Sequence, residues 1–259
     1  MKNVISAPLN AVKDTIHIPA SKSISNRMLI IRSLAQSMAG LYNLSESDDT
    51  EVLSKSLDAQ SDVKDVGHAG TSMRFLTAYF ATQPGEVILT GSQRMKQRPI
   101  GPLVDALKQV GASIEYLETI GCPPLKIKGG NLIGGNIGID AGISIQIISA
   151  LMMIAPLLAG GLTIELKGRV VSSTYIQMTL SLMNSCGALA RYDGKNISIP
   201  QGSYSVDNFS VESDWSAASY WYQVAALLPG SEIVLPHLSR DSLQGDSVLV
   251  HIFESLGVQ

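Results

Sequence analysis

The middle of the sequence reads Gly70-Thr71-Ser72-Met73-Arg74-Phe75-Leu76-Thr77-Ala78-Tyr79 and then Glu86-Val87-Ile88-Leu89-Thr90-Gly91. Apolar residues at helical spacing fill the first segment, and the β-branched run of the second is typical of a strand. A basic loop and a second helical segment over residues 102–107 follow, and the helix closes at Gly111. Glycine just past a helix is the usual residue for a left-handed cap. We therefore predict the order helix, strand, polar loop, helix, glycine, strand.

This order of elements returns along the chain. Second and third copies cover residues 144–188 and 215–258, and close their second helices at Gly187 and Gly257. A shorter version covers residues 25–59, with a strand over 41–44 and a helix capped from Ser47 onward. Copies recur about every 70 to 77 residues. The pattern predicts an α/β fold built from about four repeated modules. The alternative is an ordinary α/β domain whose elements are evenly spaced by chance.

The last copy ends at Gly257-Val258-Gln259, where its closing strand should begin. We therefore expect this strand, and further units, to be missing from the chain.

Composition narrows the class of protein. Of the 259 residues 45% are hydrophobic and 16% charged, as expected of a globular chain, and the net charge of −3 gives no basic stripe for a nucleic acid. No apolar run is long enough for a membrane span, and no apolar signal segment follows Met1. We expect a cytoplasmic protein. Cys122 and Cys186 have no metal-ligand spacing and are expected to be free thiols.

Three polar loops hold the residues suited to chemistry. In the first, residues 19–27, Lys22, Ser23 and Arg27 occupy the start of a predicted helix. A helix N-terminus favours anions, Lys adds a point charge, and Arg adds a planar fork for a phosphate or carboxylate. The alternative is that Ser21 caps the helix and both cations are solvated.

In the second loop, Gly70 and Thr71 begin a helix and allow close backbone approach to an anion. The third, residues 93–100, contains Arg98 and lies at the same point of the repeat as residues 172–175 and 240–244. Hydrogen-bond donors at matching positions of these three loops predict that the loops converge on one edge of the fold. Cations and hydroxyls without a metal cluster or a nucleophile motif fit a small phosphorylated and carboxylated substrate. His68 could act as an acid or base, but a lone His before a Gly-rich turn is more often structural.

Together these loops resemble signatures of the 5-enolpyruvylshikimate-3-phosphate synthases. The similarity covers residues 21–27, 70–74, 89–107, 144–146, 172–175 and 241–246, in order along nearly the whole chain. There are two departures: His68 stands where the family has Asn, and Ile145 stands where it has Ser or Ala.

The resemblance implies an inside-out α/β barrel of two similar domains, each made of three βαβαββ units and joined by a double-crossover hinge. Residues 20–205 would be the complete shikimate-3-phosphate-side domain, and residues 1–19 plus 206–259 the beginning of the second, incomplete domain. The implied activity is transfer of the enolpyruvyl group of phosphoenolpyruvate to the 5-hydroxyl of shikimate 3-phosphate, with release of phosphate. It belongs to the shikimate pathway of aromatic amino-acid and chorismate biosynthesis, and uses no metal or organic cofactor.

By the same resemblance, the family's site roles transfer position by position. Those for shikimate 3-phosphate fall on Lys22, Ser23, Arg27, Ser144, Gln146, Ser172 and Tyr175. Those for phosphoenolpyruvate fall on Lys22, Gly70, Thr71, Arg98 and Gln146.

The family's catalytic acid and base residues have no match in this chain. We therefore expect the 259-residue chain to bind substrate without turnover. Two alternatives stay open: a non-catalytic metabolite-binding module derived from the enzyme, and a UDP-N-acetylglucosamine enolpyruvyl transferase. The second is disfavoured because its Lys-Asn loop and catalytic Cys loop are not found. We expect the full-length protein to be monomeric. The part-built domain should expose Trp215, Tyr220, Trp221 and Tyr222, which would favour self-association.

Overall fold

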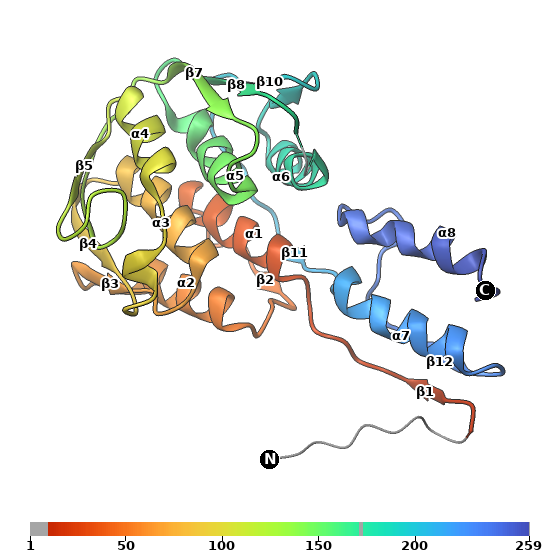
Figure 1. Ribbon diagram of the computed structural model, residues 1–259. Coiled ribbons are helices and arrows are strands. Elements are labelled where there is room, and N and C mark those ends of the chain that lie inside the picture. The colour runs from red at the N-terminus through yellow and green to blue at the C-terminus, as the bar shows by residue number, and fades with distance from the viewer. Residues whose placement is uncertain (1–9, 171–172, 259) are drawn as a thin grey trace. The chain divides into compact units, whose positions relative to one another are not determined.

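A computed structural model describes residues 10–170 and 173–258 (Figure 1). The chain divides into two compact units, one formed by residues 22–211 and the other by residues 1–21 with 212–259.

The larger unit contains two four-stranded sheets with the same topology. Each follows the order βαβαββ, with a parallel pair of strands and then two antiparallel strands, in the spatial orders β3-β4-β6-β5 and β7-β8-β10-β9. The first comprises β3 (Val63–Asp65), α3 (Gly70–Thr82), β4 (Gly85–Thr90), α4 (Gly101–Gln109), β5 (Ser113–Tyr116) and β6 (Leu125–Gly129). The second comprises β7 (Gly135–Asp140), α5 (Ile145–Ile154), β8 (Leu162–Lys167), α6 (Ser173–Ser185), β9 (Arg191–Tyr192) and β10 (Asn196–Ile199). Short 3-10 turns, η1 (Met95–Gln97) and η2 (Ala155–Leu157), follow β4 and α5.

The predicted closing glycines take the left-handed backbone that the pattern requires. Gly111 follows α4 with φ 100°, Gly187 follows α6 with φ 90°, and Gly257 follows the last helix with φ 86°. Only glycine adopts this region without a steric cost from Cβ, so the repeat predicted from the sequence is confirmed at these turns.

A third set of elements completes the larger unit. It comprises α1 (Lys22–Leu34), β2 (Leu41–Tyr42) and α2 (Asp48–Asp58), with β11 (Phe209–Ser210) running parallel to β2.

The core of the larger unit is helical, and the sheets lie outside it. Nearly every residue of α3 and α5 is buried, as is most of α1. The strands instead alternate between buried and exposed residues, as in β7 and β10. Ile137, Ile164 and Ile197 stand opposite one another on the buried face of the second sheet. Alternation of this kind marks sheets with one solvated face. In Figure 1, β4 and β5 correspondingly lie outside α3. The predicted inside-out α/β arrangement is confirmed.

The smaller unit pairs β1 (Lys13–Thr15) in parallel with β12 (Glu232–Val234). Its helices are α7 (Trp215–Leu227), the short turn η3 (Gly245–Val248) and α8 (Leu249–Glu254). Asp214 caps α7, because its carboxylate accepts a hydrogen bond of 3.0 Å from the Ala217 N–H.

One expectation about the smaller unit is wrong. Trp215 is buried, with only 4% of its surface exposed, because Tyr222, Phe253 and Ile18 pack against it. Tyr220 is exposed as expected, and Trp221 and Tyr222 are partly buried. The ring centroids of Trp215 and Tyr222 are 6.4 Å apart, so this small unit builds an aromatic core of its own.

Candidate functional site

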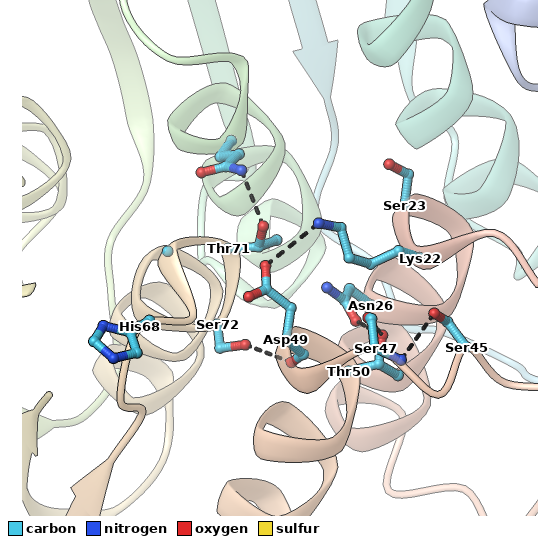
Figure 2. A network of polar contacts seen from close by, with 12 residues as sticks. Lys22, Ser23, Asn26, Ser45, Ser47, Asp49, Thr50, His68, Thr71 and Ser72 are labelled. Atoms are coloured by element: carbon cyan, nitrogen blue, oxygen red, sulfur yellow. Dashed lines mark hydrogen bonds and ion pairs between the residues drawn. The ribbon is translucent and has the colours of Figure 1, made fainter. Parts of the chain in front are cut away.

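The N-terminal ends of α1, α2, α3 and α5 meet at one point of the larger unit (Figure 2). Lys22, at the start of α1, forms an ion pair of 3.8 Å with Asp49 in the first turn of α2. Ser72 in the first turn of α3 donates a hydrogen bond of 2.7 Å to the Asp49 carbonyl. These contacts bring the starts of α1, α2 and α3 together. The predicted convergence of the loops 93–100, 172–175 and 240–244 stays a prediction, because Ser172 lies outside the described residues and 240–244 belong to the smaller unit.

A second link joins α3 to α5. The Gln146 amide donates a hydrogen bond of 2.9 Å to the Thr71 hydroxyl, and each residue lies in the first turn of its helix. Ala69 precedes α3 and Ser144 precedes α5, and neither side chain caps its helix in the described structure. Uncapped first turns keep N–H groups free for a ligand and carry positive partial charge, so this end of the unit is suited to anions.

Buried polar contacts beneath Lys22 fix the end of α1. The Thr50 hydroxyl donates to the Asn26 side-chain oxygen at 2.7 Å, and the Ser45 N–H donates to the Ser25 hydroxyl at 2.9 Å. All four residues are buried. Hydrogen bonds of this kind hold one chain geometry, because an unpaired buried group would cost about 1–3 kcal/mol. The Lys22 backbone is therefore held firmly, while its side chain is about half exposed.

Arg27 is buried, which the sequence alone did not indicate. Only 3% of its surface is exposed, and its guanidinium donates hydrogen bonds of 2.7 Å to Thr179 and 2.8 Å to Ser149. It also lies 5.9 Å from the centroid of the Tyr175 ring. Burial lowers the pKa of Arg27 to about 10, and the charge interaction with Tyr175 acts in the opposite direction. The alternative in which Arg27 is simply solvated is therefore wrong.

Two arginines lie beside the first turn of α3. The Arg98 guanidinium is so close to Gly70 that a Cβ there would lie 2.5 Å from Arg98 Nη1. Arg74 is buried, and its Nη1 donates a hydrogen bond of 2.8 Å to the Gly70 carbonyl. Burial and then the charge of Arg98 lower the pKa of Arg74. Two like charges at one helix N-terminus favour the binding of an anion between or beside them.

The remaining predicted residues are Ser23, Tyr175, Ser144 and Ser172. Ser23 and Tyr175 lie near Arg27, since the Ser23 carbonyl accepts a hydrogen bond of 2.9 Å from it. Ser144 is exposed directly before α5, two residues before Gln146 in the chain. Ser172 lies outside the described residues, so the structure gives no position for it.

Sequence reasoning missed several residues of this site. Asp49 was seen only as part of a helix start, although it pairs with Lys22. Ser149 and Thr179 hold Arg27 from helices far along the chain. The only available signal was that each is a polar residue within an apolar helical segment.

The described residues offer neither a metal centre nor a membrane-spanning helix. Across residues 10–170 and 173–258, no group of three or more His, Cys, Asp or Glu side chains is placed to hold a metal ion. None of the helices in those ranges is long and apolar enough to cross a membrane.

Comparisons with known proteins agree in one family. The family model for EPSP synthase (3-phosphoshikimate 1-carboxyvinyltransferase) matches residues 51–259. A 3-phosphoshikimate 1-carboxyvinyltransferase of Bacteroides fragilis strain ATCC 25285 is 49% identical over 259 residues, which is 100% of this chain and 63% of the relative. One from Photobacterium damsela subsp. piscicida is 38% identical over 288 residues, covering 100% of this chain and 67% of the relative.

Among solved structures, the EPSP synthase of Acinetobacter baumannii has the same fold, with a TM-score of 0.77 and 22% identity. The similarity covers 90% of this chain and 57% of that one. The chain thus spans about 63% of the length of the Bacteroides relative that it matches from end to end.

Proposed function

The chain belongs to the EPSP synthase family, and we propose that it forms the shikimate-3-phosphate side of a 3-phosphoshikimate 1-carboxyvinyltransferase. In the proposed reaction, the 5-hydroxyl oxygen of shikimate 3-phosphate replaces the phosphate on the enolpyruvyl carbon of phosphoenolpyruvate. The products are the enolpyruvyl ether and inorganic phosphate.

The observation that carries this proposal is the meeting of the α1, α2, α3 and α5 N-termini around Lys22, with Arg98 against Gly70. Both substrates carry a phosphate and a carboxylate. Free N–H groups, helix partial charges and cationic side chains are the donors that such groups require. The ion pair of Lys22 with Asp49, whose carbonyl is bound by Ser72 of α3, supports a role for the Lys22 ammonium in contacting both proposed ligands.

For shikimate 3-phosphate we assign Lys22, Ser23, Arg27, Ser144, Gln146, Ser172 and Tyr175. The Arg27 guanidinium donates three hydrogen bonds within the protein, and these fix its orientation. A guanidinium has five N–H groups, so others are left to bind a ligand. Its proximity to Tyr175 supports a shared surface for the shikimate ring. The exposed Ser144 hydroxyl at the start of α5 suits the 3-phosphate.

For phosphoenolpyruvate we assign Lys22, Gly70, Thr71, Arg98 and Gln146. Gly70 leaves room for Arg98 against the helix start, and Thr71 and Gln146 are already hydrogen-bonded to each other. A preformed arrangement of this kind reduces the ordering cost of binding.

Turnover further requires a group that removes the proton of the 5-hydroxyl and one that protonates the enolpyruvyl carbon, both within a closed site. Among the described residues, Asp49 is the carboxylate that contacts Lys22, and it is held in that ion pair. We propose that these 259 residues bind shikimate 3-phosphate weakly and do not turn over.

Calorimetric titration with shikimate 3-phosphate, together with a phosphate-release assay on both substrates, tests this function. We expect one-to-one binding that Lys22→Met weakens. Lys55→Met is the matched control, because Lys55 is an exposed lysine paired with Glu51 on α2. Absence of binding at millimolar ligand would contradict the substrate assignment, and phosphate release at an ordinary enzymatic rate would contradict the absence of turnover.

We further propose a cytoplasmic location, supported by the two free thiols Cys122 and Cys186. For the isolated chain we propose self-association through the exposed apolar residues of α7 and α8, such as Tyr220, Leu227 and Ile252. Sedimentation velocity over a range of concentrations tests it, and a sedimentation coefficient independent of concentration would contradict it.

A further inference from the structure

Two segments of the larger unit run side by side at the start of α3. The loop of residues 66–69 leads into α3, and the segment of residues 91–98 leaves β4. The Ser92 N–H donates a hydrogen bond of 3.0 Å to the Gly67 carbonyl. A Cβ on Gly91 would lie 2.7 Å from the same carbonyl, so glycine is needed for this close approach.

His68 contacts this second segment at both of its ends. At the beginning, its ring nitrogen Nδ1 is hydrogen-bonded to the Ser92 hydroxyl at 2.8 Å. At the end, its carbonyl accepts a hydrogen bond of 3.5 Å from Arg98 Nη1. In Figure 2 the imidazole points away from Lys22 and Asp49, so the ring faces this segment and not the converging helix ends.

The Ser92 hydroxyl connects these contacts to Arg98 through the backbone. It accepts a hydrogen bond of 3.3 Å from the Met95 N–H, which begins the turn η1. The Met95 carbonyl in turn accepts a hydrogen bond of 3.0 Å from the Arg98 N–H. The hydrogen bonds that lead from the His68 ring to the Arg98 backbone therefore pass through the hydroxyl of Ser92.

A like charge beside Arg98 gives a reason for such a restraint. The buried Arg74 carries the same charge beside the same residue, since its Nη1 donates to the Gly70 carbonyl while the Arg98 guanidinium lies against the Gly70 Cα. Burial lowers the pKa of Arg74, and the charge of Arg98 lowers it further. A long side chain beside a like charge lowers its free energy by swinging into solvent unless other contacts hold it.

We propose that His68 is a positioning residue that, through Ser92, holds Arg98 against the first turn of α3 in the geometry that binds the anion there. The proposal deepens the assigned function, since the anion is phosphoenolpyruvate in that scheme.

A double-mutant cycle on His68→Ala and Ser92→Ala tests the proposed link. Phosphoenolpyruvate is titrated in the presence of shikimate 3-phosphate, and shikimate 3-phosphate is titrated alone. We expect each single variant to weaken phosphoenolpyruvate binding by about 5- to 10-fold and the double variant by no more than either, because both remove one link. Shikimate 3-phosphate affinity should not change.

His68→Asn separates the hydrogen bond from the ring. The side-chain oxygen of Asn is bonded to Cγ, as Nδ1 of His is, and it can accept a hydrogen bond from the Ser92 hydroxyl. We expect this variant to keep phosphoenolpyruvate affinity within about 2-fold of the unaltered chain. The proposal would be overturned if the affinity losses of the two single variants multiplied in the double variant. It would also be overturned if a variant lost affinity equally for phosphoenolpyruvate and shikimate 3-phosphate.

A readout without ligand keeps this test separate from the proposed function. The Arg98 Nε–H group can be followed by NMR relaxation in the ligand-free chain, where we expect it to be ordered and His68→Ala to make it mobile. If the unaltered chain binds neither substrate, the proposed function fails, and the role of His68 is still decided by this measurement. Equal Arg98 order in both proteins would overturn it.

Discussion

Gly70→Ala is the substitution that separates binding from stability most sharply. A Cβ at this position would lie 2.5 Å from Nη1, 2.6 Å from Nη2 and 2.8 Å from Cζ of Arg98. Ordinary carbon contacts begin near 3.4 Å, so the guanidinium must move by about 1 Å. A displacement of that size takes a hydrogen bond beyond its useful range.

We expect Gly70→Ala to weaken phosphoenolpyruvate binding and to stabilise the folded state. Losing one charge-assisted hydrogen bond costs about 1.5–3 kcal/mol, which weakens phosphoenolpyruvate binding by about 10- to 150-fold. Replacing a helical glycine by alanine stabilises the folded state by up to about 1 kcal/mol. We therefore expect an unchanged or higher urea midpoint together with a large loss of affinity, measured by calorimetry in the presence of shikimate 3-phosphate.

Gly101→Ala is the matched control. Gly101 also begins a helix, α4, but a Cβ there would meet nothing closer than 3.7 Å. It should give the same small effect on stability and none on binding. Unchanged phosphoenolpyruvate affinity in Gly70→Ala would refute the assignment of Arg98, in its observed position, as a ligand of that substrate.

Three further substitutions give distinct outcomes. Arg27→Met should abolish shikimate 3-phosphate binding yet leave the free energy of unfolding in urea unchanged within about 1 kcal/mol, because the desolvation cost implied by a pKa lowered to about 10 offsets three hydrogen bonds. Strong destabilisation would contradict this. Burial raises the pKa of Tyr204, whose hydroxyl donates to the Met153 carbonyl at 2.8 Å. The folded chain therefore keeps this proton when the unfolded chain loses it, and the stabilisation, complete below about pH 10, falls as pH rises further. Tyr204→Phe should flatten this part of the stability profile, and an equally steep profile would refute the linkage. Gly129→Ala would place a Cβ 1.6 Å from the backbone oxygen of Gln83, and should cost at least about 3 kcal/mol in urea unfolding; near-native stability would contradict that packing.

The repeat was predictable because its signals are local. A glycine that must adopt positive φ, such as Gly111 or Gly187, is visible in the sequence next to the helix it ends. Helix and strand periodicities are set by a residue's near neighbours, and the family signatures lie in the same loops. This information was sufficient for the order of elements and for most of the residues that gather at the helix ends.

The rest depends on contacts between distant parts of the chain. Arg27 is buried because Thr179 and Ser149 meet it from helices 152 and 122 residues away. Trp215 is buried because Ile18 and Phe253 close over it from opposite ends of the chain. The His68 link to Ser92 joins the start of one helix to the loop after the next strand. None of these pairings has a local signature, so only the folded structure could reveal them.

The most direct test of the central claim is a crystal structure of this chain soaked with shikimate 3-phosphate. The account predicts ligand density at the N-termini of α1 and α5, with the ring beside Tyr175 and a carboxylate or phosphate oxygen within hydrogen-bond distance of Lys22. Density at any other place, or a shikimate ring that leaves Arg27 and Tyr175 uncontacted, would contradict it.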